Sequence, residues 1–241
     1  MLRVEGLYKA FGGLRVLEGI DFQVAEDEIV GLIGPNGAGK TTLYNVITGY
    51  YKPDAGHVLL DDEDITGLSP AQVCRLGLCR TFQIVKPFGN LSVEKNVAIG
   101  SLVRTRSVKE AHRAAMEEIL FLGLEHLKDV PSRSLTLSDR KRLELARALA
   151  TKPRFLLLDE VMCGLNPTEV KGMLDLIRRI HDRGIGIVVI EHIMTAVMSL
   201  SDRVVVLSQG KVIKDGTPQE VSCDPEVIKA YLGEGYQHAG T

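Results

Sequence analysis

The sequence predicts an α/β fold with a mainly parallel sheet, an N-terminal antiparallel β part and an inserted α-helical segment. Apolar runs at 28–33, 154–160 and 185–190 are typical of buried parallel strands, because both faces of such strands are covered. Helical periodicity follows each of the first two runs. Between residues 92 and 150 the pattern is helical, with no convincing strand. An insertion into an α/β chain explains this order.

Two strands are expected ahead of the first buried run, at 2–8 and 16–24, with a turn at 11–13 between them. These two strands are expected to form a short antiparallel sheet, and a further strand is expected at 58–60. The aromatic ring of Phe11 at the end of the first strand can stack on a purine, and packing in the core is the alternative.

Several helices begin with capping residues. Ser69-Pro70 and Asn166-Pro167 each place a capping side chain before a proline at the first helical position. Thr217-Pro218-Gln219-Glu220 is a capping box that follows a hairpin at 203–214. The expected helices cover 40–48, 70–77, 108–127, 135–150, 167–184 and 218–232.

Composition and charge limit the classes of function. The chain has 241 residues, 45% of them hydrophobic, and a net charge of −2, so no basic surface for nucleic acid is expected. No apolar run approaches the ~20 residues that span a bilayer, so any membrane role would act through partners. The cysteines show no C-x-x-C spacing, and we expect reduced thiols in a cytosolic protein rather than a metal site. They are Cys74, Cys79, Cys163 and Cys223.

A glycine-rich motif lies between the first buried run and the first expected helix. It matches G-x-x-x-x-G-K-[ST], the P-loop, in which backbone N–H groups and the helix N-terminus bind a triphosphate. Lys40 would reach the β- and γ-phosphates, and Thr41 would place its hydroxyl on Mg²⁺. A chance glycine-rich turn is the alternative, and the flanking strand and helix argue against it. The motif comprises Gly34, Pro35, Asn36, Gly37, Ala38, Gly39, Lys40, Thr41 and Thr42.

Polar side chains follow the later buried strands. Asp159 and Glu160 end the second run, where ligands bind in open α/β sheets. Asp159 suits the Mg²⁺ site and Glu160 suits a group that orients or deprotonates water, and an acidic loop start is the alternative. His192 follows the third run. Such a histidine is more often structural, but beside a phosphate site it could donate to the γ-phosphate. A lone glutamine such as Gln83 is usually a surface residue, and it is a candidate here because a Mg²⁺ site needs a neutral oxygen ligand that can come and go.

The order P-loop, Gln83, helical insertion, Asp159-Glu160, His192 resembles the ATP-binding subunit of an ABC transporter, from residue 2 to about 233. The resemblance implies a P-loop NTPase core at 1–85 and 152–233 and an inserted signature subdomain at 86–151. The small residues at 234–241 indicate a flexible tail.

The same resemblance implies ATP and Mg²⁺ as cofactors and hydrolysis of ATP to ADP and phosphate. It implies that Phe11 stacks on adenine and that Thr41, Gln83 and Asp159 bind Mg²⁺. Lys40, Glu160 and His192 would then be the catalytic residues. Gly164-Leu165-Asn166 matches the D-loop, with Asn where many members have Asp.

Finer matches look like the branched-chain amino acid uptake branch of that family. They are Arg80 to Gln83, Gly164 to Glu169, Ile190 to His192 and Val227 to Gly233. This branch implies two permeases, a second and different ATP-binding subunit, a periplasmic solute-binding protein, and a place on the inner face of the cell membrane. Importers for urea and for aromatic acids belong to the same branch, so the cargo stays open.

The signature segment departs from the family's usual L-S-G-G-Q. Here it reads Leu135-Thr136-Leu137-Ser138-Asp139. In the family this loop contacts ATP on the opposite subunit, so Thr136 and Ser138 are expected nucleotide contacts. Leu137 and Ser138 add Cβ atoms where glycines let the backbone approach phosphate, and Asp139 adds a negative charge. A dimer with two unequal ATP sites is therefore the hypothesis.

Other functions remain as alternatives to an uptake motor. An ATP-binding regulator with little turnover would fit the altered signature, although Glu160 and His192 argue against it. A soluble ABC ATPase of DNA repair or translation usually carries two cassettes or long coiled coils. A small-molecule kinase explains neither His192 nor the helix after Leu135.

Overall fold

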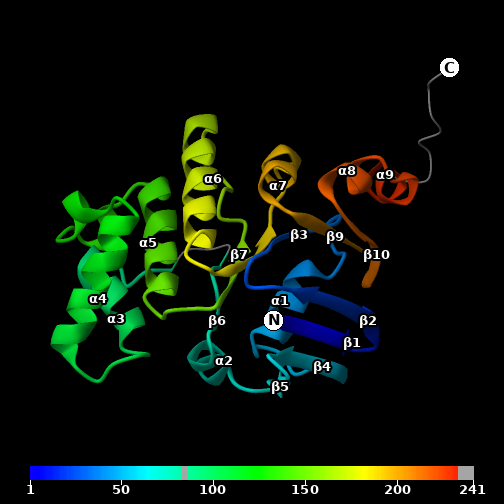
Figure 1. Cartoon of the computed structure of the whole chain (residues 1–241), viewed down its shortest axis with the longest axis horizontal. Helices are drawn as coiled ribbons and strands as arrows, with labels where there is room; N and C mark the ends of the chain where they lie inside the picture. The colour runs from blue at the N-terminus through cyan, green and yellow to red at the C-terminus, as the bar shows by residue number, and fades with distance from the viewer. Residues whose placement is uncertain (83–85, 233–241) are drawn as a thin grey trace.

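The computed structural model describes residues 1–82 and 86–232 and contains two sheets (Figure 1). The larger has six strands in the order β10-β9-β3-β8-β7-β6, and all of its pairs are parallel except that of β9 with β10. The mainly parallel sheet is thus confirmed. Its strands are β3 (Ile29–Ile33), β6 (Leu78–Arg80), β7 (Phe155–Asp159), β8 (Gly186–Ile190), β9 (Arg203–Ser208) and β10 (Lys211–Gly216).

The smaller sheet is antiparallel, as predicted, in the order β2-β1-β4-β5. Its strands are β1 (Leu2–Phe11), β2 (Leu14–Val24), β4 (Ala55–Leu60) and β5 (Glu63–Asp64). β1 and β2 pair further toward their turn than predicted. Gly12 and Gly13 have φ angles of 53° and 87°, a two-residue turn that lets pairing continue to Phe11 and Leu14.

The helices are α1 (Lys40–Ile47), α2 (Pro70–Leu76), α3 (Val93–Ser101), α4 (Val108–Phe121), α5 (Leu137–Leu149), α6 (Pro167–His181), α7 (Met194–Leu200), α8 (Pro218–Ser222) and α9 (Pro225–Leu232). Ser69, Asn166 and Thr217 are N-caps followed by proline, as predicted, and each begins a capping box, which was predicted for Thr217 alone. The predicted helix at 108–127 is too long. Gly123 has a φ of 70° and ends it, and a short 3-10 turn follows.

Both faces of the larger sheet are buried. One face packs with α5, α6 and α7, and the other with α1 and the smaller sheet. Tyr44 of α1 lies fully buried between the sheets, and its hydroxyl donates to the carbonyl of Val188 at 2.9 Å. Neighbouring residues alternate between the faces, as the period of two requires. Ile29, Leu156, Leu158, Ile187 and Val189 belong to the first face, and Val30, Leu157, Val188 and Ile190 to the second.

The helices α3, α4 and α5, here called the helical segment, lie at one end of the molecule, opposite α8 and α9 (Figure 1). Two buried carboxylates attach this segment to the rest. Glu118 of α4 accepts two hydrogen bonds from Arg183, at 2.6 and 3.0 Å. Glu144 of α5 accepts one from the N–H of Phe82 at 2.6 Å.

Candidate functional site

The P-loop connects the buried strand β3 to α1. Gly34, Gly37 and Gly39 have φ angles of 152°, 81° and 107°. A Cβ on Gly34 would lie 2.1 Å from the carbonyl oxygen of Leu207, and one on Gly39 would lie 2.8 Å from that of Val16. Only glycine therefore fits at 34 and 39, and the loop is held curled against β9 and β2.

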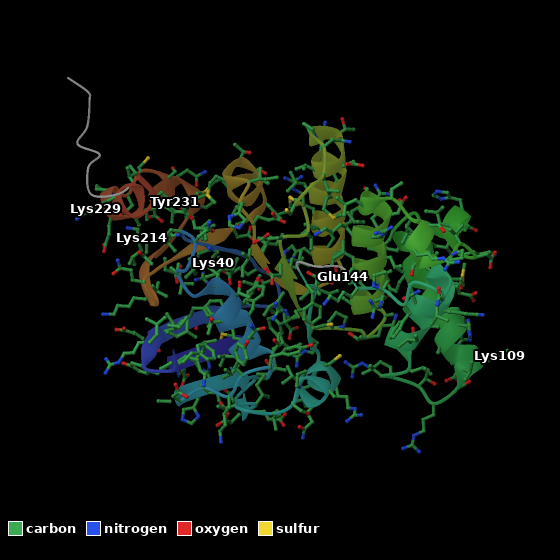
Figure 2. The ribbon with its side chains drawn as sticks, turned by 180° about the vertical axis from the view of Figure 1, so that it is seen from behind. Lys40, Lys109, Glu144, Lys214, Lys229 and Tyr231 are labelled. Atoms are coloured by element: carbon green, nitrogen blue, oxygen red, sulfur yellow. The ribbon has the colours of Figure 1, made fainter. Side chains whose placement is uncertain are left out.

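Lys40 begins α1 in the middle part of the molecule (Figure 2). Its ammonium donates to the carbonyl oxygens of Gly34 at 2.6 Å and Pro35 at 3.1 Å. Burial lowers the pKa of Lys40, while the charges of Glu160 and Asp159 oppose the shift. The charged group is thus held over the loop by acceptors that a phosphate could replace.

Three predicted parts of the site line one cavity of about 360 Å³. The P-loop from Asn36 to Thr42 forms one wall, and Glu160 and His192 face it from the ends of β7 and β8. Neighbouring parallel strands end at the same edge, which explains why residues 32 positions apart meet here. The structure therefore brings together the P-loop, Glu160 and His192.

Glu160 is tightly constrained. Its φ is 50°, a backbone conformation that residues other than glycine rarely adopt. Its N–H donates to the carbonyl of Ile190 at 2.9 Å, and its carbonyl accepts from Lys141 at 2.8 Å. Its carboxylate contacts Nε2 of His192 at 2.8 Å. The surrounding contacts thus fix an uncommon backbone and aim the side chain at the cavity.

Asp159 lies one residue earlier and is only 3% exposed. Burial raises its pKa, whereas Arg80, whose Nη2 donates to Oδ2 at 2.7 Å, acts to lower it. Thr41 and Asp159 line a second cavity, of about 470 Å³, together with Arg80. A hydroxyl and a carboxylate at one cavity suit a hard cation such as Mg²⁺.

No group of three His, Cys, Asp or Glu side chains that could hold a metal occurs in the described part of the chain. A Mg²⁺ ion at Thr41 and Asp159 would therefore take its other ligands from phosphate and water, its usual manner of binding to nucleotides. Gln83, the third predicted ligand, lies outside the described residues.

Neither Phe11 nor the signature residues line the P-loop cavity, although Leu14, the strand partner of Phe11, does. The ring of Phe11 is 41% exposed and meets Tyr51 edge-on at 5.1 Å, so the alternative of core packing is wrong. Thr136 is the N-cap of α5, because its hydroxyl accepts from the N–H of Asp139 at 3.2 Å. Ser138 lies in the first turn of α5, and neither residue lines the cavity.

Sequence reasoning missed two buried charged residues beside the site. Arg80 was noted only as part of a family-like segment, although it ends the strand next to Asp159. Glu191 precedes His192, is 2% exposed and accepts from the N–H of Met162 at 2.7 Å. Burial raises the pKa of Glu191 to about 7. A charged residue next to a buried strand end was the available signal for both.

Two family models match the chain. The model of the ABC transporter matches residues 17–162. The model of the branched-chain amino acid ATP-binding cassette transporter matches residues 211–237. Within 1–82 and 86–232, no helix is long and apolar enough to cross a membrane.

Similar proteins match over nearly their full length. The high-affinity branched-chain amino acid transport ATP-binding protein BraF of Pseudomonas aeruginosa is 40% identical, with 97% of this chain and 98% of that protein covered. LivG of Escherichia coli, described in the same words, is 39% identical with equal coverage. The lipopolysaccharide export system ATP-binding protein LptB of Acidithiobacillus ferridurans is 38% identical, with 98% of each chain covered.

Solved structures agree with this fold. A nucleotide-free ATP-binding cassette from an ABC transporter has a TM-score of 0.89 and 31% identity. An ATP-binding cassette in its ADP conformation has a TM-score of 0.88 and 32% identity. Each match covers 97% of this chain and 99% of the other. The chain belongs to the ABC transporter family as an ATP-binding cassette.

Proposed function

We propose that this chain is the ATP-hydrolysing subunit of an importer for branched-chain amino acids. The observation that carries the proposal is the single cavity formed by the P-loop, Glu160 and His192. Relatives named for branched-chain amino acid transport support the cargo class.

The proposed reaction is transfer of the γ-phosphoryl group of ATP to water. The P-loop N–H groups and Lys40 bind the phosphates, and Lys40 exchanges its loop carbonyls for phosphate oxygens. Glu160 accepts a hydrogen bond from water and takes its proton as the water oxygen bonds to phosphorus and the bond to ADP breaks. His192 donates to the γ-phosphate and orients Glu160. Thr41 and Asp159 would hold Mg²⁺, which would supply positive charge to neutralise the phosphates.

The proposed partners are two permeases, a second and different ATP-binding subunit and, indirectly, a solute-binding protein, with this chain on the inner face of the membrane. A groove of about 650 Å³ between α2 and the end of α3 suits a permease segment. Ile99, Leu102 and Val103 are exposed there beside Arg75 and Arg106, so the groove fits a short amphipathic helix with acidic side chains.

The proposed second subunit follows from the signature segment. Leu137 is 47% exposed at the start of α5, where the family approaches the opposite ATP. A bulky side chain and the nearby charge of Asp139 make this face a weaker partner for phosphate than glycines would be. A partner with an intact signature would complete the ATP site of this chain.

Glu160→Gln is the first test, because it removes the base and keeps the shape of the site. We expect this variant to bind ATP with Mg²⁺, to lose turnover by about a hundredfold or more, and to remain monomeric when alone. ATPase assays and mass in solution measure these outcomes. The double variant Glu160→Gln/Lys40→Ala is the control that should lose nucleotide binding.

Three outcomes would contradict parts of the proposal. Unchanged turnover in Glu160→Gln would reject Glu160 as the base. An ATP-dependent homodimer of Glu160→Gln would reject the need for a different partner. Unchanged leucine uptake in cells that lack this chain, beside loss of another solute, would reject the cargo.

A further inference from the structure

Arg80 is the buried cation closest to the proposed magnesium ligand Asp159. It ends β6, whose neighbour β7 ends with Asp159, so both side chains lie at the same edge of the sheet. The side chain of Arg80 is 5% exposed. Burying a guanidinium is costly unless its donors are paired.

Every nitrogen of the guanidinium has an acceptor. Nη2 donates to Oδ2 of Asp159 at 2.7 Å, and Nη1 to Oδ1 of Asn45 at 2.6 Å. Nε donates to the carbonyl oxygen of Thr81 at 3.3 Å. These acceptors come from β7, α1 and the end of β6, so the planar group is fixed in one orientation.

Aromatic rings surround the same group. The centre of the guanidinium lies 4.8 Å from the ring of Phe82, 5.6 Å from Tyr44 and 5.9 Å from Tyr50. Such rings attract a cation and exclude water. The positive charge is therefore both immobile and poorly screened.

This charge lines the cavity that contains the proposed magnesium ligands, Thr41 and Asp159. Lys86, Arg147 and Glu144 line the same cavity, and Arg80 is the cation there that forms an ion pair with Asp159. It binds Oδ2 of Asp159, so a magnesium ion would be bound through the other oxygen, Oδ1. It also offsets one of the two negative charges of Asp159 and Glu160. A site with less negative charge binds a divalent cation weakly until the phosphates of a nucleotide add their own negative charge.

We propose that Arg80 is a positioning residue of the magnesium site, which orients Asp159 and restricts Mg²⁺ binding to the nucleotide-bound state. The inference rests on the ATP site proposed above. Two variants separate charge from shape. Arg80→Gln removes the charge, whereas Arg80→Lys keeps it but cannot reach three acceptors from one planar group.

The test measures thermal unfolding and fluorescent-nucleotide binding of the full chain at increasing MgCl₂. For Arg80→Gln we expect MgCl₂ alone to raise the unfolding temperature, and for the wild type we expect no such rise. We also expect nucleotide binding to need about tenfold less Mg²⁺. Arg80→Lys keeps the wild-type Mg²⁺ dependence and lowers kcat. A merely structural role would lower stability in both variants and leave the Mg²⁺ dependence unchanged.

Arg104→Gln is the matched control. Its guanidinium donates to the carbonyl oxygens of Thr151, Arg75, Cys74 and Lys152 and has no carboxylate partner in the described residues. This change should cost stability without any effect of MgCl₂ alone. An unchanged or raised Mg²⁺ requirement in Arg80→Gln would overturn the inference. If the wild type does not bind nucleotide, the proposed ATP site is rejected. The effect of MgCl₂ on the unfolding temperature, measured without nucleotide, would still test the role of Arg80.

Discussion

Glu191 is the side chain beside the site whose protonation changes near neutral pH. Burial raises its pKa to about 7, from 4.5 for an exposed glutamate. Between these values the folded protein holds a proton that the unfolded chain has released, so its contribution to stability falls as pH rises from 4.5 to 7.

We expect Glu191→Gln to remove this pH dependence. The amide oxygen still accepts from Met162 and carries no charge at any pH. Relative to the wild type, the free energy of unfolding of the variant should rise by about 2 kcal/mol between pH 5 and pH 8. Urea unfolding at several pH values measures it. Glu63→Gln, on an exposed carboxylate, should follow the wild type at every pH. A constant difference between Glu191→Gln and wild type would contradict the pKa shift.

At the residue scale, spacing along the chain predicts some parts of the site and misses others. The P-loop glycines, Asp159 and Glu160 follow a local order, and the cavity brings the loop, Glu160 and His192 together. The pairing of Arg80 with Asp159 joins residues 79 positions apart across two strands, which no local pattern contains. The assigned roles in ATP binding and hydrolysis remain predictions.

The signature segment forms the N-terminus of α5. Thr136 accepts from the N–H of Asp139 and donates to its carboxylate at 2.6 Å, so its hydroxyl serves as a helix cap. Any contact of this hydroxyl with a partner's ATP competes with these bonds.

We therefore expect Thr136→Ala to act on folding as well as on assembly. Loss of the cap should lower the free energy of unfolding by about 1 kcal/mol. Ser107→Ala is a matched control, because Ser107 caps α4 in the same way. Denaturant unfolding should show similar losses, and only Thr136→Ala should also slow ATP hydrolysis by the assembled transporter. Equal hydrolysis by both variants would argue against a role of Thr136 at the opposite site.

The ends of helices were harder to predict from the sequence than whether a segment is a helix or a strand. The apolar stripe of α4 continues past Gly123 in sequence, but a glycine with positive φ ends the helix at Phe121. α7 was not predicted, because it is seven residues long and has no side-chain cap. Short helices depend on packing for their stability. In α7, Ala196 is buried in one hydrophobic cluster and Val197 in another.

The core of the whole molecule is continuous from the helical segment into the larger sheet. Ala115 and Ile119 of α4 belong to the same buried cluster as Leu156 of β7 and Ile177 of α6. The sequence predicted the helical insertion, but not that its core merges with that of the sheet. Separate boundaries at 86 and 151 remain a prediction.

A shared core predicts cooperative unfolding of the whole chain. We expect calorimetry to show one transition, with equal calorimetric and van't Hoff enthalpies. Ile119→Ala should lower the stability of that single transition by about 2–5 kcal/mol, while Ile99→Ala, at a residue 38% exposed, should have little effect. Two separate transitions, with only one affected by Ile119→Ala, would show that the helical segment unfolds independently.

The two carboxylates that attach the helical segment reach different parts of the larger sheet's surroundings. Glu118 of α4 is bound to Arg183, and Glu144 of α5 is bound to the N–H of Phe82, two residues after Arg80. Because α3 and α5 share one buried core with the larger sheet, a permease that pushed on α3 would displace α5 as well. Through Glu144, that displacement would reach Phe82 and the strand that carries Arg80.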